Sequence, residues 1–227
     1  MKGLAGAFGA IFNVIYLVIG VNLLLAVTCA PVWVLALFVP LKNSWLWLAL
    51  VSILLAPALA GAYAVFRGYR RDESVTIFTT YLTTWATSWP RVWRPGLCLV
   101  AGALIVGLDV YVMWRWGMLM AALPVAILLV AVALATACVA WVGFAARPDL
   151  GWWDVVKGSA VLAVRQPGWS LLTLIMLGIG AAAAWVQPII GLGLVVTPVL
   201  YVVWSNSRQI FAKFLPANEL ADQEAKP

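Results

Sequence analysis

The chain has 227 residues, of which 65% are hydrophobic and 10% charged, with a formal net charge of +6. A typical soluble domain is about 25% charged, and a water-soluble fold of this composition would expose large apolar patches. The absence of histidine excludes Ser-His-Asp catalysis and the usual zinc and haem ligand sets. The three cysteines sit apart in apolar segments, so we predict no disulfide, metal or cofactor.

Six apolar runs have about the length that a membrane-spanning helix needs, which is roughly 20 residues. We predict an all-α, polytopic transmembrane helix bundle in residues 1–214, with a flexible cytoplasmic tail at 215–227. The first run is too long for the apolar region of a signal peptide, so we interpret it as an uncleaved span. The predicted spans cover residues 10–33, 45–66, 96–113, 118–144, 169–186 and 189–205.

The basic residues predict the orientation of these spans. With the N-terminus inside, all but two of the 14 Lys and Arg residues fall in inner segments, the exceptions being Lys42 and Arg115. An excess of Lys and Arg in cytoplasmic loops is typical of membrane proteins, so we predict both termini in the cytoplasm. This placement in short loops also argues against a nucleic-acid partner and favours a lipid bilayer as the surroundings of the chain.

Between the second and third spans, residues 74–90 are predicted to form a cytoplasmic amphipathic helix. Asp72 and Glu73 precede it, as acidic residues do at a helix start, and apolar side chains recur along one face at helical spacing. This apolar stripe consists of Ile77, Phe78, Tyr81, Leu82, Trp85 and Trp89. A helix with such a stripe lies along the inner leaflet or docks on another protein.

A second amphipathic helix is predicted at residues 152–165, between the fourth and fifth spans. Both segments end in Pro-Gly before a span, at Pro95–Gly96 and Pro167–Gly168, which indicates a degenerate internal repeat. Two such helices side by side predict a partner-docking surface. Its candidate residues are Asp72, Glu73, Phe78, Tyr81, Trp85, Trp89, Trp152, Trp153 and Asp154.

Two polar residues stand out within the predicted spans. Asp109 is an acid in the outer third of the third span, where it either lies at the outer interface or contacts a solute or ion. Asn22 in the first span is expected to form interhelical hydrogen bonds. We treat both as a candidate polar membrane site.

Three short motifs give the chain a likeness to a known family. They are Asn22–Leu23–Leu24 with Pro31, the segment Ala56–Pro57–Ala58–Leu59–Ala60–Gly61–Ala62–Tyr63, and Arg71–Asp72–Glu73 with Phe78. Over residues 10–100 the chain resembles the YesL family of small bacterial membrane proteins. Members often carry Lys and Arg where this loop helix has Thr. The resemblance implies association with sugar ABC importers.

These observations favour a non-enzymatic accessory or regulatory subunit of a bacterial carbohydrate ABC importer. Its two inner amphipathic helices would contact the permease or the ATPase. The alternative is a stand-alone or oligomeric small-solute transporter or channel that uses Asp109. An intramembrane enzyme is least favoured, because the chain has no His and few acids.

Overall fold

Every regular element in the computed structural model is helical across the residues that it describes, which are 2–40, 47, 50–71, 76–146, 150–187 and 191–212. The helices with bounds are α1 (Lys2–Thr28), α2 (Ala30–Phe38), η1 (Ser52–Leu54), α4 (Leu55–Arg71), α5 (Ile77–Arg115), α6 (Leu119–Ala146), α7 (Trp152–Arg165), α8 (Pro167–Val186), η2 (Gly191–Val195) and α10 (Val196–Ala212). The all-α prediction is confirmed for this part of the chain.

Four of the described helical segments are long and apolar enough to cross a membrane: Ser52–Arg70, Ile77–Arg115, Leu123–Phe144 and Pro167–Ala184. They correspond to the second to fifth predicted spans. The first predicted span contains a shorter apolar helix, Phe12–Thr28. The sixth falls on η2 and α10, and α10 has 17 residues. By length and composition, the four segments identify the chain as an α-helical membrane protein.

The first predicted span, residues 10–33, is not one helix. α1 ends at Thr28 and α2 begins at Ala30, with Cys29 between them at φ −103° and ψ 14°. Pro31 is the cause, because it lacks a backbone N–H and its ring clashes with the carbonyl four residues earlier. Proline is tolerated in the first turn of a helix, which is where Pro31 lies in α2.

The two Pro-Gly steps differ, so the predicted repeat does not extend to local structure. Gln166 leaves the helical conformation before Pro167, and α7 and α8 are separate helices. At Pro95–Gly96 the helix continues, so the predicted amphipathic helix and third span form one 39-residue helix, α5. Pro95 and Gly96 are buried, and a Cβ at Gly96 would lie 3.1 Å from the Cβ of Ala56. Close packing on α4 thus accompanies the unbroken helix.

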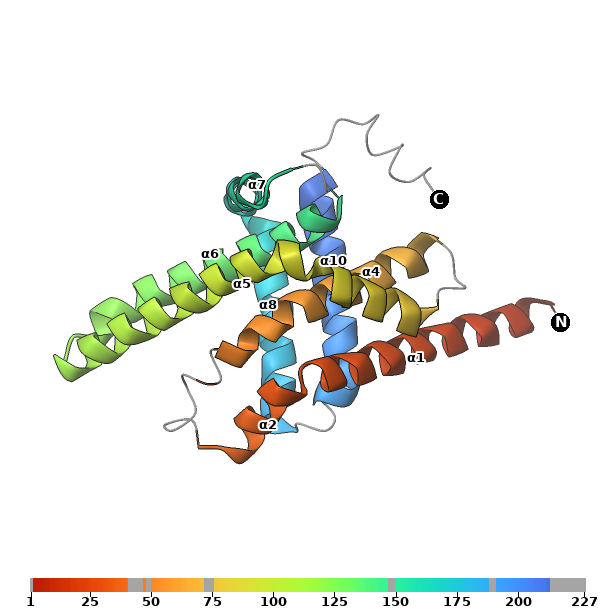
Figure 1. The fold of residues 1–227 in the computed structure, drawn as a ribbon, viewed down its shortest axis with the longest axis horizontal. Helices are drawn as coiled ribbons and strands as arrows, with labels where there is room; N and C mark the ends of the chain where they lie inside the picture. The colour runs from red at the N-terminus through yellow and green to blue at the C-terminus, as the bar shows by residue number, and fades with distance from the viewer. Residues whose placement is uncertain are drawn as a thin grey trace.

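The turn between α5 and α6 follows from its glycine. Gly117 has φ +71°, a conformation that glycine adopts without steric cost. The N–H of Met118 donates to the carbonyl of Met113 at 2.8 Å, and that of Gly117 to Trp114 at 3.1 Å. These two bonds form a Schellman motif, which ends α5 and reverses the chain. Figure 1 shows α5 and α6 as a long hairpin that extends away from the other helices.

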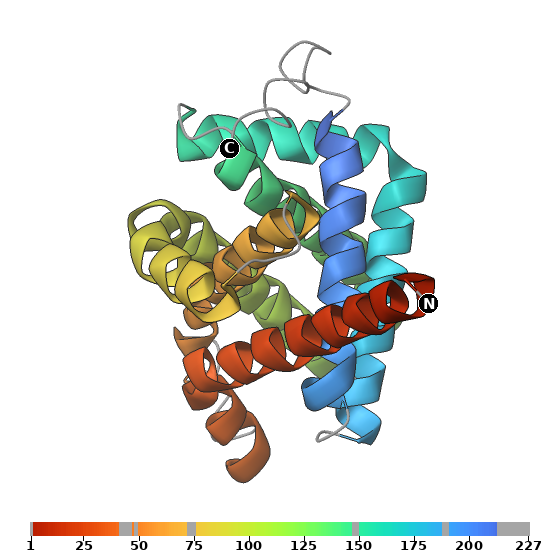
Figure 2. The same cartoon turned by 90° about the vertical axis from the view of Figure 1, so that its right-hand side faces the viewer.

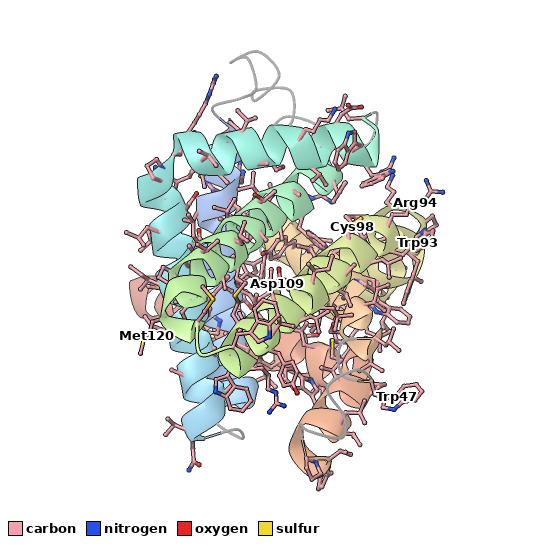
Figure 3. The ribbon with its side chains drawn as sticks, turned by 90° about the vertical axis from the view of Figure 1, so that its left-hand side faces the viewer. Trp47, Trp93, Arg94, Cys98, Asp109 and Met120 are labelled. Carbon is pink, nitrogen blue, oxygen red and sulfur yellow. The ribbon has the colours of Figure 1, made fainter. Side chains whose placement is uncertain are left out.

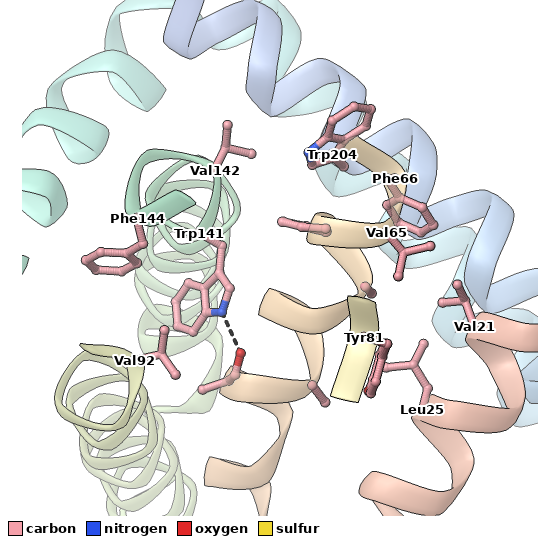
Figure 4. Close-up of a cluster of buried hydrophobic side chains, with 14 of the residues drawn as sticks. Val21, Leu25, Val65, Phe66, Tyr81, Val92, Trp141, Val142, Phe144 and Trp204 are labelled. Carbon is pink, nitrogen blue, oxygen red and sulfur yellow. Dashed lines mark hydrogen bonds between the residues drawn. The ribbon is translucent and has the colours of Figure 1, made fainter. Parts of the chain in front are cut away.

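The helices form a crossed bundle. α8 and α10 run side by side and cross the α5–α6 hairpin and α4 steeply (Figure 1), and α7 lies across one end of them (Figure 2). α4 packs mainly on α5, α6 on α7, and α8 on α10. Their shared core holds large side chains from α1, α4, α5, α6 and α10 (Figure 4). Labelled members of this core are Val21, Leu25, Val65, Phe66, Tyr81, Val92, Trp141, Val142, Phe144 and Trp204.

Candidate functional site

The predicted docking residues on α5 divide between core and surface. Tyr81 is fully buried, and its hydroxyl lies 2.8 Å from that of Thr28 on α1. Its ring packs on Gly61 of α4, where an added Cβ would lie 3.1 Å away. Tyr81 therefore holds α5 against α1 and α4 and does not face a partner. Phe78, by contrast, is 40% exposed.

Two tryptophans continue the predicted stripe on α5. Trp85 and Trp89 are half-buried, and their rings pack edge to face with centroids 6.1 Å apart. The indole N–H of Trp85 is buried without a hydrogen-bond partner in the described structure. Asp72 and Glu73, predicted to precede this stripe, lie outside the described residues.

The opposite face of this part of α5 is lined with threonine. Thr79, Thr83 and Thr87 are exposed, and each hydroxyl donates to a backbone carbonyl of the preceding turn, at 3.1, 2.6 and 2.7 Å. A threonine bonded in this way shows its methyl group to its surroundings. This face is therefore less polar than its sequence indicates.

Helix α7 presents two distinct faces. Val155, Ser159 and Leu162 are buried, and Val155 packs so closely on Gly143 of α6 that an added Cβ there would lie 2.8 Å from its side chain. The outward face carries Trp153, Lys157, Val161 and Val164, all exposed, which we call the α7 outer stripe. The Lys157 ammonium lies 5.3 Å from the centre of the Trp153 ring, a cation–π contact.

The other predicted residues of α7 lie beside this stripe. Trp152 is half-buried, and its ring centroid is 5.5 Å from that of Trp153. Asp154 is exposed in the first turn of the helix, where a carboxylate is favoured by the helix dipole. Helix α7 contacts α5, the helix that contains the first predicted docking segment.

Asn22 joins α1 to the C-terminal helices, which confirms the expected interhelical hydrogen bonds. Its Nδ2 donates to the carbonyl of Gly193 at 2.6 Å, and its Oδ1 accepts from the N–H and the hydroxyl of Thr197 at 3.2 and 2.6 Å. Gly193 and Thr197 are four residues apart, a pair that bonds directly in a regular α-helix. The Asn22 amide bridges them at η2, where the helix widens to a π-turn.

Asp109 lies apart from Asn22. It is exposed on α5, within the part of the α5–α6 hairpin that extends from the bundle (Figure 3). Asn22 is 5% exposed, and its amide is engaged in the three bonds above. The structure therefore does not bring the two predicted polar membrane residues into one site.

The structure also contains a cavity that was not predicted. It has a volume of about 530 Å³ and lies between α4, α5 and α6, with one residue each from η1 and α8 and two from α10. Its lining includes Tyr63, Cys98, Gly102, Ala133, Cys138 and Trp141. The Trp141 indole donates to the carbonyl of Ala56 at 2.7 Å (Figure 4), so its N–H is already used.

The sequence did not predict this cavity, because the composition of its lining is the same as that of any apolar membrane-spanning segment. The available signal was the set of small residues on neighbouring runs, Gly102 and Ala103 on one and Ala133 and Ala137 on the other. Cys98 and Cys138 also line the cavity. Cys98 is exposed, Cys138 is half-buried, and both thiols are free.

Comparison with known proteins identifies no family. No protein-family model, no curated protein and no solved structure matches the chain.

Proposed function

We propose that the chain is a six-span protein of the bacterial inner membrane, with both termini in the cytoplasm. In Figure 1, α7 and the end of α10 lie at the top and the end of α4 and the start of α1 on the right, whereas α2 and the end of α8 lie at the bottom and the α5–α6 turn at the lower left. These predicted cytoplasmic ends lie apart from the predicted outer ends, and this separation supports the proposal. α5 spans about 58 Å, nearly twice the hydrocarbon thickness, so its first half lies outside it.

In that membrane the chain acts as a non-enzymatic accessory or regulatory subunit of a carbohydrate ABC importer. The observation that carries this proposal is the α7 outer stripe, which is apolar and exposed on the side of α7 that turns away from α6. Aromatic residues such as Trp153 are enriched at protein interfaces relative to the rest of the surface. The link to carbohydrate import rests on the YesL resemblance.

The alternative function, a stand-alone transporter, has less support from the structure than the accessory subunit has. None of the described residues that line the cavity is charged, and Asp109 is not among them. A polar solute would lose its hydration there without gaining hydrogen bonds, which costs several kcal/mol.

Affinity purification from mild detergent tests the docking proposal. Importer permease or ATPase subunits are expected to co-purify with the wild-type chain and to be lost from the Trp153→Ala and Val161→Ser double variant. Trp114→Ala is the matched control, because Trp114 is similarly exposed but lies at the far end of the α5–α6 hairpin. Recovery of the wild-type chain without importer subunits, under conditions that keep importers intact, would contradict the proposal.

A further inference from the structure

We propose that the cavity between α4, α5 and α6 binds a hydrocarbon chain of a membrane phospholipid. Its volume of about 530 Å³ falls within the about 300–1,000 Å³ typical of small-molecule sites. The lining extends from Gly96 to Val106 on α5 and from Leu129 to Trp141 on α6. These stretches run about 15–18 Å along the helices, so the cavity is elongated like an extended chain.

The chemistry of the walls selects an apolar ligand. Few polar side chains line the cavity, and one of them, Trp141, already donates its indole N–H to the carbonyl of Ala56. The remaining surface is formed by aliphatic side chains, glycines, two thiols and Tyr63. Such a surface offers dispersion contacts along its whole length but almost no site for a hydrogen bond.

The surroundings of the cavity identify hydrocarbon as its occupant. Its inner wall includes buried residues such as Ala56 and Val203, whereas its outer wall includes exposed residues such as Gly102 and Leu129. The cavity thus opens through the outer face of α5 and α6. Both helices are membrane-span candidates, so a lipid chain is what meets this opening.

Glycine residues of α5 provide a matched pair of variants for testing this site. Gly102 lines the cavity and Gly107 does not, yet a Cβ added at either position would meet no atom within 4 Å. A leucine at Gly102 has room to extend into the cavity without disturbing the helix. The same change at Gly107 adds the same bulk to the same helix outside the cavity.

The experiment uses the full chain in phosphatidylethanolamine and phosphatidylglycerol vesicles that contain a phospholipid with a diazirine in one acyl chain. After irradiation, mass spectrometry maps the labelled residues. We expect labelling to concentrate on the cavity lining, above that of Ile105 and Leu108, which are exposed outside the cavity. Labelling of the lining should fall several-fold in Gly102→Leu and stay unchanged in Gly107→Leu.

A second variant and a melting measurement keep the result interpretable. Ala133→Leu narrows the cavity from α6 and replaces Gly102→Leu if the latter lowers the melting temperature. Equal labelling of the lining and of Ile105 and Leu108 would overturn the proposal, because it would mean ordinary surrounding lipid. An equal fall in the labelling of the lining in Gly102→Leu and Gly107→Leu would also overturn the proposal. Covalent dimers formed through Cys98 by a bifunctional maleimide, with no lipid adducts in the lining, would assign the cavity to a second copy of the chain.

Discussion

The two halves of α6 have the same apolar character but opposite surroundings. Between residues 123 and 134 no described side chain is buried, whereas Ala135 and the stretch from Val139 to Phe144 are buried. The exposed half pairs with residues 100–115 of α5, and together they form what we call the outer hairpin. The buried half meets α4, α7 and α10. Apolar composition therefore places a helix in the membrane without specifying whether protein or lipid covers it.

Close contact between helices in the buried core depends on small residues. Gly61 meets Tyr81, Gly96 meets Ala56, and Gly143 meets Val155 and Phe211. In the outer hairpin, Gly102 and Gly107 meet nothing within 4 Å. Because lipid is as apolar as the helices, association inside a membrane relies on packing and hydrogen bonds. Glycine allows close packing only where another helix is present.

Truncation of a buried aromatic residue should have the largest effect on stability. Tyr81→Ala is expected to lower the free energy of unfolding by about 3–5 kcal/mol, because it leaves a cavity at the junction of α1, α4 and α5. Tyr111→Ala on the same helix should change it little, since Tyr111 is 54% exposed in the outer hairpin. Unfolding by a denaturing detergent in mixed micelles measures both. Similar losses of stability in the two variants would show that the buried core and the outer hairpin do not differ in this respect.

A larger side chain at a close contact between helices should have the second-largest effect on stability. Gly143→Leu is expected to destabilise the fold by about 1–3 kcal/mol or more, because its side chain overlaps Val155 of α7 and Phe211 of α10. Gly107→Leu is the control and should be neutral. The same unfolding titration applies, with far-ultraviolet circular dichroism to confirm helix content. A neutral Gly143→Leu would mean that α7 packs on α6 less closely than described.

Loss of the Asn22 bridge should have a moderate effect. Asn22→Leu removes three hydrogen bonds and should cost about 2 kcal/mol, since interhelical hydrogen bonds in a membrane contribute about 0.6 kcal/mol each on average. Asn13→Leu on α1 is the control, because Asn13 is only half-buried. We also expect faster hydrogen exchange at Thr197 in Asn22→Leu alone. Unaltered exchange would show that the amide bridge is not needed to hold η2.

Neutralisation of Asp109 should have the smallest effect. The side chain is exposed in the outer hairpin, so Asp109→Asn is expected to change the free energy of unfolding in micelles by no more than about 0.5 kcal/mol. Solute flux in proteoliposomes provides the second measurement. A flux in the wild-type chain that disappears in Asp109→Asn would favour the transporter alternative over the accessory subunit.

The sequence by itself determined the helical class and the positions of most helices, because long uncharged runs are stable only as helices in hydrocarbon. It also predicted the amphipathic character of α7 and the hydrogen-bonding role of Asn22, since both follow from spacing and from the cost of an unpaired amide in a span.

Only the tertiary structure decided what each apolar face touches. Hydropathy is the same for a side chain that meets lipid and for one that meets another helix, so the sequence did not separate Tyr81, in the core, from Phe78, on the surface. For the same reason it concealed the cavity, whose walls come from several apolar runs that look alike in sequence. The unbroken course of α5 past Pro95 likewise depends on α4, a neighbour that local sequence does not contain.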